Sequence, residues 1–155
     1  VRFGGAVYGL STLPGGAPSW LRPAMTLSAR LALVKRVPPG SGVSYGHRYV
    51  TERETTLGLV PLGYADGVPR AAAGQHLVSA RGRRWPIAGT VCMDQFVVDF
   101  GDEPVAAGEP VVLFGPGDDG EATAQEWGER LGTISYDIAT GIGARVPRHY
   151  PDGSG

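Results

Sequence analysis

Two tyrosines and a histidine lie close together in GVSYGHRY, residues 42–49, directly after the turn sequence PPGSG. A tyrosine acts as a general acid or base only when a neighbouring group eases the loss of its proton, because its free pKa is about 10. His47 and the nearby arginines are candidates for that group beside Tyr45. The alternative is a half-buried strand tyrosine with its hydroxyl at the surface. Residue type alone favours this alternative.

The stretch GYADGVPR, residues 63–70, has the composition of a strand end followed by a turn. An aspartate at the position of Asp66 most often bonds to the turn backbone. The guanidinium of Arg70 has a fork of donors that could hold a carboxylate or a phosphate. A solvated loop arginine is the commoner role. This stretch therefore predicts a turn and leaves an anion contact open.

The stretch VCMDQF, residues 91–96, places a cysteine, a methionine and an aspartate between two apolar runs. Metal ligation by Cys92 and Asp94 is disfavoured, because there is no second cysteine and no histidine at ligand spacing. Core packing by Cys92 and Met93 is the simplest interpretation. A backbone N–H exposed at such a bend could still hold an anion.

Several other patterns argue against particular chemistries. GPGDDG, residues 115–120, lacks the lysine and the Ser/Thr of a phosphate-binding loop, and its two aspartates would repel phosphate, so a turn is predicted. The three histidines show no spacing suited to zinc, and no Gly-X-Ser-X-Gly elbow of a serine hydrolase is present. No metal site is expected.

The overall composition narrows the class of protein. A chain of 155 residues is long enough for one domain with a hydrophobic core, and its net charge of −1 gives no electrostatic reason to expect nucleic acid. No apolar run approaches the length needed to cross a bilayer, so no membrane partner is expected. The single cysteine excludes an intramolecular disulfide framework and fits a reducing compartment. The cytoplasm is the expected location.

These candidate residues must be positioned by short strands and tight turns. The 25 glycines and 13 prolines indicate many chain reversals rather than long helices. Short apolar runs bounded by turn residues favour a mainly β fold, a Greek-key-like β-barrel. The runs lie at 25–37, 55–65, 76–80, 83–93, 95–100 and 110–115.

The remaining segments complete the predicted domain. Residues 123–133 combine a capping box, Thr123 with Glu126, with a short amphipathic pattern ending in glycine, which predicts the one helix. Residues 134–150 have the pattern of a final strand, a glycine turn and a closing strand. Residues 1–10 form a strand-like run expected at the end of a preceding domain, followed by a linker at 11–23. Residues 24–150 are the predicted β-domain, and 151–155 a frayed tail.

Five motifs occur in an order that resembles the C-terminal part of alanine racemase. They are VRFGGAVYGL, LALVKRVPPGSGVSYGHRY, LGLVPLGYADGVPR, IAGTVCMDQFVVDF and LGTISYDIATGIGARVPRHY. The resemblance implies a mainly β domain cut from a two-domain homodimeric enzyme whose N-terminal (β/α)8 barrel is absent. It also implies pyridoxal 5′-phosphate as cofactor, bound to a lysine of that missing barrel. Lys35, the only lysine here, matches no cofactor position.

Residue roles follow from the resemblance. Tyr45 matches the catalytic tyrosine that reaches into the partner subunit's site and moves the α-proton on one face, while the cofactor lysine serves the other. The backbone N–H of Met93 matches the contact to the substrate carboxylate, also across the dimer. Tyr136 matches the tyrosine that bonds the cofactor phosphate. Further residues match positions that line the site or its entrance, namely Tyr64, Arg70, Ile134 and Asp94.

The resemblance leaves three functions to compare. The leading expectation is racemisation of L- and D-alanine for peptidoglycan by the full-length enzyme, with the isolated chain inactive. The second is a serine or broad-specificity amino-acid racemase, which shares these motifs. The third, from another class, is a stand-alone β-barrel interaction module. Loss of the tyrosine and methionine positions would favour that module, and all of them are present.

Overall fold

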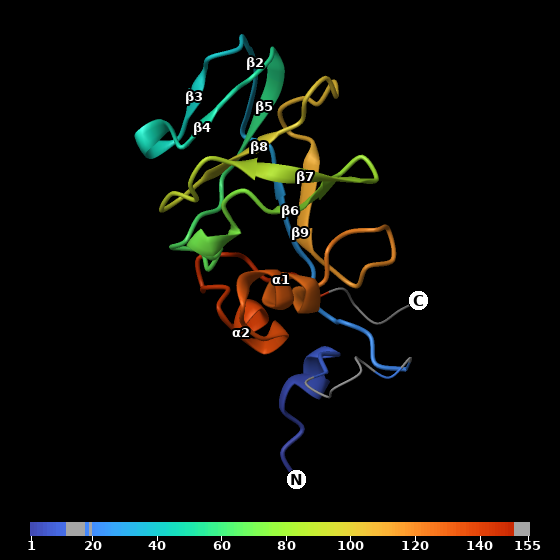
Figure 1. Cartoon of the computed structure of the whole chain (residues 1–155). Helices are drawn as coiled ribbons and strands as arrows, with labels where there is room; N and C mark the ends of the chain where they lie inside the picture. The colour runs from blue at the N-terminus through green and yellow to red at the C-terminus, as the bar shows by residue number, and fades with distance from the viewer. Residues whose placement is uncertain (12–17, 19, 151–155) are drawn as a thin grey trace.

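Antiparallel strands dominate the structure. The computed structural model describes residues 1–11, 18 and 20–150. Its main sheet has seven strands, all in antiparallel pairs, which confirms the mainly β class (Figure 1). In chain order they are β1 (Leu27–Arg30), β2 (Leu33–Val37), β5 (Thr55–Val60), β6 (His76–Ala80), β7 (Arg83–Ala88), β8 (Phe96–Asp99) and β9 (Pro110–Phe114).

The sheet curls because β1 and β2 are two halves of one kinked run. The strand order is β1-β9-β6-β7-β8-β5-β2, so β1 pairs with β9 at one end and β2 with β5 at the other. At the kink, the Leu31 N–H donates to the backbone carbonyl of Glu109 at 2.9 Å. The N–H of the next residue, Ala32, donates to the backbone carbonyl of Leu59 at 2.9 Å. The predicted strand at 25–37 is therefore real but changes neighbours midway. This change of partner gives the sheet its barrel-like curvature.

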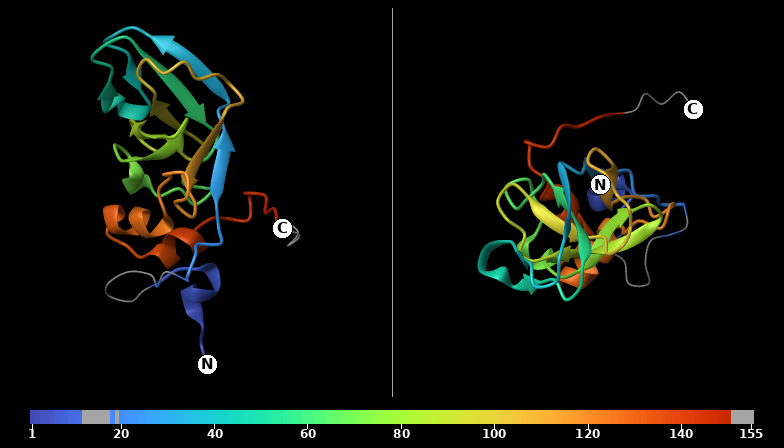
Figure 2. Two further views of the ribbon diagram at one scale, coloured as in Figure 1. Left: turned by 90° about the vertical axis from the view of Figure 1, so that its right-hand side faces the viewer. Right: turned by 90° about the horizontal axis from the view of Figure 1, so that it is seen from above.

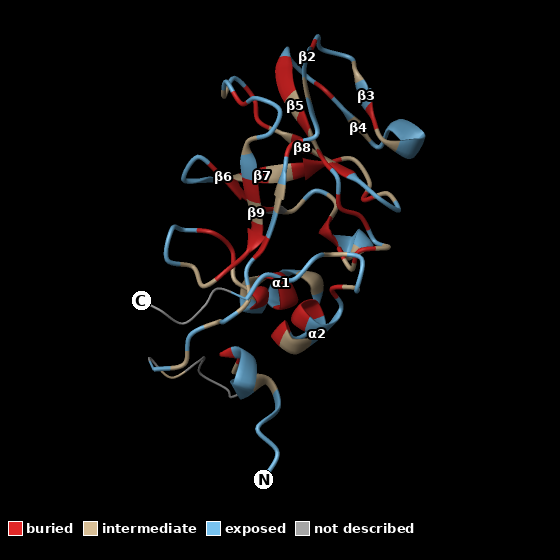
Figure 3. Cartoon of the chain, turned by 180° about the vertical axis from the view of Figure 1, so that it is seen from behind, coloured by how far each residue is buried: buried red, intermediate tan, exposed pale blue. Residues whose placement is uncertain are grey.

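Large apolar side chains fill the inside of the curled sheet, and Figure 3 colours the buried positions of its strands red. Phe96, Val98 and Phe100 alternate inward along β8 and the residue after it, and each is fully buried. On β5, a Cβ at Gly58 would lie 2.6 Å from the ring of Phe100, so a side chain there would displace that ring. Each large apolar side chain buried in this way contributes about 1.5–3 kcal/mol.

The helix predicted at 123–133 is confirmed as α1 (Ala124–Leu131). The Thr123 hydroxyl accepts the Glu126 N–H at 3.2 Å, and the Glu126 carboxylate accepts the Thr123 N–H at 2.9 Å, which is the predicted capping box. Arg84 of β7 donates to the same carboxylate at 2.8 Å. Burial alone would raise the pKa of Glu126, but the donors of Arg84 and Thr123 outweigh it and lower that pKa.

The strand predicted after α1 is wrong: the chain forms a second helix, α2 (Ser135–Thr140). Ile134, Tyr136 and Ile138 alternate with polar residues, which imitates a strand. The buried positions are instead spaced three and four apart, as on a helix, because this face packs against α1 and the barrel core. They are Ser135, Ile138, Ala139 and Ile142. No closing strand follows it within the described residues.

The N-terminal segment also differs from its predicted strand. Residues Gly4–Tyr8 form a 3₁₀ helix, η1, ended by Gly9 in the left-handed conformation with φ 71°. A Cβ at Gly9 would lie 1.6 Å from the carbonyl oxygen of Arg22, so only glycine fits where these two stretches meet. Of the predicted linker, residues 12–17 and 19 lie outside the described residues, as does the predicted tail at 151–155.

A small hairpin stands beside the main sheet. It consists of β3 (Gly42–Val43), the 3₁₀ turn η2 (Tyr45–His47) and β4 (Tyr49–Val50), and its two strands pair only with each other. Seen from above, it projects from the side of the barrel (Figure 2). Residues 42–50 are called the tyrosine hairpin below. Among the helices of the described chain, none is long and apolar enough to cross a membrane.

Candidate active site

Four segments that carry the predicted site residues follow one another along one side of the molecule, at the left of Figure 1. They are the tyrosine hairpin, the VCMDQ loop (residues 91–95), the GYADG loop (residues 63–67) and α2. Direct contacts link the neighbours: a Cβ at Gly89, just before the VCMDQ loop, would lie 2.9 Å from the Val43 oxygen of the hairpin. A Cβ at Gly67 would lie 2.2 Å from the Gly141 oxygen at the end of α2.

Tyr45 is presented to the outside. Its side chain is 82% exposed at the tip of the tyrosine hairpin, and its hydroxyl makes no hydrogen bond within the described part of the chain. The turn around it is compact, because Ser44, Gly46 and His47 all have positive φ. His47 packs over Gly42, where a Cβ would lie 2.5 Å from the imidazole, and forms no hydrogen bond with Tyr45. The interpretation of Tyr45 as a half-buried strand residue is wrong.

The GYADG and VCMDQ loops are joined through their backbones. Tyr64 donates its N–H to Cys92 at 3.0 Å, and Ala65 donates to Met93 at 2.9 Å. Gly63 allows this approach, because a Cβ there would lie 2.2 Å from the Met93 oxygen. The Asp66 carboxylate accepts the Gly63 N–H at 2.8 Å, which confirms the predicted bond to the turn backbone.

The VCMDQ loop turns its methionine outward. Met93 is 53% exposed, so the prediction that it packs in the core is wrong. The bend is closed by the N–H of Cys92, which donates to Gln95 at 2.9 Å. The N–H of Met93 itself makes no hydrogen bond to any described residue. This leaves one backbone donor at the bend free to hold an anion, as a carboxylate contact requires.

Arg145 links the same two loops, and the sequence patterns did not single it out. It donates to the Asp94 carboxylate at 2.6 Å, and its Nε lies 3.4 Å from the carboxylate of Asp66. The hydrogen bond to Asp94 and the charge of Asp66 raise the pKa of the Arg145 guanidinium. Arg145 follows α2 in the chain, so no local spacing connects it with either aspartate. The excess of arginine over lysine was the only available hint.

Tyr64 and Arg70 lie together at the surface. The guanidinium carbon of Arg70, at the start of the 3₁₀ turn η3 (Arg70–Ala72), is 5.7 Å from the centre of the Tyr64 ring. Tyr64 is 42% exposed. Such a cation–π contact orients both groups and leaves the guanidinium donors open to a carboxylate or phosphate.

Tyr136 and Ile134 lie at the start of α2, at the other end of this side. The Tyr136 ring centre is 6.0 Å from that of Tyr8 in η1, and a Cβ at Gly5 would lie 3.7 Å from its edge. The Tyr136 hydroxyl donates to no acceptor among the described residues. Ile134 precedes the helix and is 56% exposed. The site residues thus occupy one side of the molecule, with Tyr45 and Tyr136 on opposite segments.

Comparison with known proteins identifies the family. Residues 24–150 match the family described as "Alanine racemase, C-terminal domain". The chain is 66% identical to the alanine racemase of Thermobifida fusca and 63% identical to that of Frankia casuarinae, in each case over 97% of this chain and 40% of the relative. The solved alanine racemase of Streptomyces coelicolor superposes with a TM-score of 0.89 at 57% identity, over 94% of this chain and 39% of that one. The chain thus spans about two fifths of these relatives.

Proposed function

The chain belongs to the alanine racemase family as its C-terminal domain, and we propose that it completes the active site of an enzyme that interconverts L- and D-alanine. The observation that carries the proposal is Tyr45, a largely exposed tyrosine whose hydroxyl meets no partner among the described residues of its own chain. The relatives named alanine racemase support the reaction. In the proposed division, residues 1–10 end a preceding (β/α)8 barrel, 11–23 form a linker and 24–150 form the β-domain.

Tyr45 moves a proton at the α-carbon of alanine in this proposal. A base must touch that hydrogen directly, and a side chain that projects 82% exposed from a hairpin can enter a neighbouring site. We propose a homodimer in which each tyrosine hairpin reaches the barrel domain of the partner subunit. We assign the groups that assist this proton transfer to that barrel, because His47 forms no hydrogen bond with Tyr45 in the described structure.

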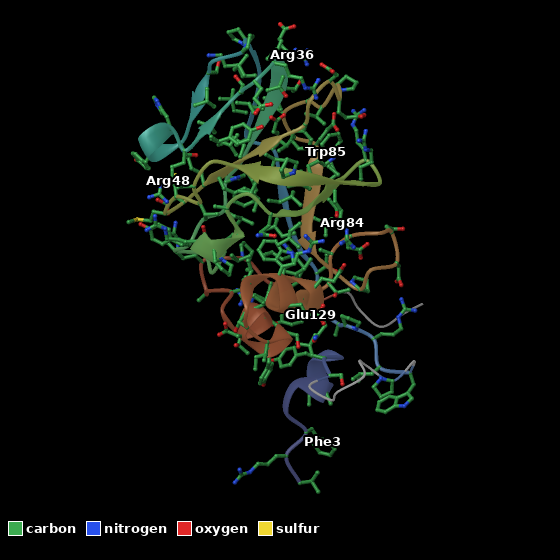
Figure 4. All side chains as sticks on the ribbon, in the orientation of Figure 1. Phe3, Arg36, Arg48, Arg84, Trp85 and Glu129 are labelled. Atoms are coloured by element: carbon green, nitrogen blue, oxygen red, sulfur yellow. The ribbon has the colours of Figure 1, made fainter. Side chains whose placement is uncertain are left out.

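The substrate carboxylate is held by the free N–H of Met93. Its loop is fixed from behind, because Arg145 binds Asp94 and the GYADG loop donates to the Cys92 and Met93 carbonyls. Tyr64, Arg70 and Ile134 line the approach in this proposal, since each is exposed. In Figure 4, Arg48 next to η2 extends from the same edge of the molecule.

Pyridoxal 5′-phosphate is the cofactor that the family implies, and when bound it withdraws electrons from the α-carbon. The fit rests on Tyr136: its hydroxyl lacks an acceptor in the described structure, and the contact with Tyr8 fixes its ring. We propose that this hydroxyl donates to the cofactor phosphate. Lys35 is exposed on β2 of the seven-stranded sheet, so the covalent lysine is assigned to the preceding domain.

The biological role follows from the proposed reaction. D-alanine is required for peptidoglycan, and we propose a cytoplasmic enzyme that supplies it, with no nucleic-acid or membrane partner. Serine is the alternative substrate, and the ratio of kcat/KM on alanine and serine decides between them. A higher value on serine would replace alanine in the proposal.

The test is Tyr45→Phe in the full-length protein. General acid–base catalysis contributes about 10²–10⁴-fold, so kcat on alanine should fall by about that factor. Tyr150→Phe, which removes a hydroxyl from a tyrosine 84% exposed near the chain end, is the control and should leave kcat unchanged. Racemisation at nearly the normal rate by Tyr45→Phe would refute the role of Tyr45.

A second measurement concerns the isolated chain. With pyridoxal 5′-phosphate and L-alanine added, we expect no D-alanine, because the chain supplies only one of the two bases that a two-faced proton transfer needs. Chiral chromatography of the mixture measures this. D-alanine above a reaction without protein would contradict the assignment of the second base to the preceding domain.

A further inference from the structure

The tyrosine hairpin contacts the rest of the domain through Val43, which is buried and whose carbonyl oxygen lies close to Gly89, but it shares few hydrogen bonds with the main sheet. Its strands pair only through Gly42 with Val50 and Val43 with Tyr49, and neither strand joins the main sheet. At its base, Thr51 exchanges hydrogen bonds with Ser41 and binds the Pro38 carbonyl. These contacts join the two ends of the hairpin to each other and to the preceding turn.

One side-chain hydrogen bond crosses from the hairpin to the main sheet in the described structure. The Tyr49 hydroxyl donates to Oδ2 of Asp99 at the end of β8. Oδ1 of the same carboxylate is already held by the barrel, since it accepts the Thr55 hydroxyl and the Gly101 N–H, the latter at 2.8 Å. The barrel thus fixes one oxygen of Asp99 and offers the other to the hairpin.

The Tyr49 hydroxyl stays protonated and can donate in this contact. Its burial and the hydrogen bond to Asp99 raise its pKa to about 12, so its hydroxyl keeps its proton at neutral pH. A hydrogen bond to an ionised carboxylate is about twice as strong as one between neutral groups. The pair is therefore suited to hold the hairpin in a single orientation.

The compact turn transmits this position to the tip. Tyr45 precedes Tyr49 by one tight turn, in which His47 packs over Gly42 and the residues around Tyr45 have left-handed φ. Such a turn has few ways to relax, so a change in the direction of β4 moves Tyr45 with it. A displacement of about 1 Å at a reacting group can cost about a hundredfold in rate.

We propose that Tyr49 and Asp99 are positioning residues for Tyr45: their hydrogen bond fixes the orientation of the tyrosine hairpin against the main sheet. This inference rests on the proposed function, because Tyr45 must act on substrate for its position to matter. Tyr49 and Asp99 touch neither substrate nor cofactor in this scheme. They act only through the direction of the hairpin.

The experiment is Tyr49→Phe in the full-length enzyme, loaded with pyridoxal 5′-phosphate. We expect kcat to fall about 10- to 100-fold, with KM for alanine changed less than about threefold. The α-deuterium isotope effect should rise only for the enantiomer whose proton Tyr45 removes, because only that transfer is misaligned. Tyr45→Phe in the same assay identifies that enantiomer, and Tyr150→Phe is the matched hydroxyl deletion.

Two further variants and one measurement make the test specific. Asp99→Asn should show the same one-sided isotope effect, and the double variant should be no slower than Tyr49→Phe alone, because the two residues act as one pair. Amide hydrogen exchange should accelerate in residues 42–50 of Tyr49→Phe and stay unchanged in the GYADG loop. Exchange measures the orientation of the hairpin independently of activity.

The outcomes separate the inference from the function. Normal kcat and isotope effects in Tyr49→Phe, with Tyr45→Phe impaired, would overturn the inference and leave the proposed function intact. An isotope effect raised for both enantiomers, or faster exchange throughout the chain, would mean general damage and would also overturn it. A nearly normal Tyr45→Phe would overturn both.

Discussion

The VCMDQ and GYADG loops and the tyrosine hairpin are two parts of the same side of the molecule, held in different ways. The loops are joined by two backbone hydrogen bonds, a glycine without room for a side chain, and the ion pairs of Arg145. The hairpin has the buried Val43 beside Gly89, and in the described structure a single side-chain hydrogen bond, from Tyr49, joins it to the main sheet. The backbone N–H that we propose as the carboxylate contact is thus held by the fold itself, whereas the tyrosine that we propose as the proton carrier is oriented, in our inference, by a hydrogen bond that a single substitution removes.

The largest effect is expected from Gly63→Ala, which adds a methyl group where the GYADG and VCMDQ loops meet. The new methyl group would lie 2.2 Å from the Met93 oxygen, and its three nearest atoms all belong to the backbone of Cys92 and Met93, so no side chain can move aside. We expect a loss of about 3 kcal/mol in the free energy of unfolding, together with weakened binding of alanine. Urea unfolding of the full-length protein and KM for alanine measure the two effects.

Gly143→Ala is the matched control for that substitution. A Cβ at Gly143 would find its nearest atom, the Ala65 oxygen, at an ordinary 3.6 Å. Its free energy of unfolding should change by less than about 1 kcal/mol. Equal losses in the two variants would mean that the close approach at Gly63 does not hold the loops together.

The next substitution, Arg145→Gln, removes the ion pairs to Asp66 and Asp94 and keeps the backbone hydrogen bonds between the two loops. In Arg145→Gln, the Asp66 carboxylate still accepts the Gly63 N–H, so the GYADG loop should keep its shape. Asp94 loses its partner, and the VCMDQ loop should loosen enough to raise KM about three- to tenfold, with kcat nearly unchanged. Steady-state kinetics on both enantiomers measures this.

Arg83→Gln is the control for a general loss of positive charge. Arg83 lies on β7, and its weak pair with Glu103, at 4.0 Å, has no link to the site loops. Its KM should match that of the parent. A drop of a hundredfold in kcat for Arg145→Gln would contradict the comparison, because the loops would then depend on side chains as much as the hairpin does.

The smallest effect is expected at alkaline pH, where Tyr49 of the tyrosine hairpin loses its proton. Tyr49 has a folded pKa of about 12, above its unfolded value near 10. The unfolded chain therefore loses this proton first, so the stability due to Tyr49 is present below pH 10 and is lost between about pH 10 and 12. Because Tyr49 is only part-buried and solvent screens its contact with Asp99, the loss should amount to about 0.5 kcal/mol.

Thermal unfolding of the full-length protein and of Tyr49→Phe at pH 8, 10 and 11.5 measures this effect. The difference between the two proteins should narrow as the pH rises, because the parent loses the contribution that the variant lacks. Parallel curves over this range would show that the Tyr49–Asp99 contact does not stabilise the fold at neutral pH.

The sequence was sufficient for the local elements. The capping box of Thr123 and Glu126 begins α1 where predicted, and the runs at 76–80 and 110–115 became β6 and β9. Asp66 bonds to its own turn, as its type and position indicated. These features depend on residues a few positions apart, so their physics is contained in the local pattern. The roles of Tyr45, Met93 and Tyr136 stay predictions from the resemblance and now have a geometry that supports them.

Only the tertiary structure decided what depends on distant residues. The alternating pattern of 134–138 is equally compatible with a strand, and contact with α1 and the core selected the helix. The chain kinks at Leu31 and Ala32 because the residues before the kink pair with β9 and those after it pair with β5. Arg145 meets Asp94 across 51 positions, and Tyr49 meets Asp99 across 50. The sequence by itself determined the elements and the residue types of the site. Which residues hold the site in place was decided by folding, because such pairs form only when the barrel brings separate segments within hydrogen-bonding distance.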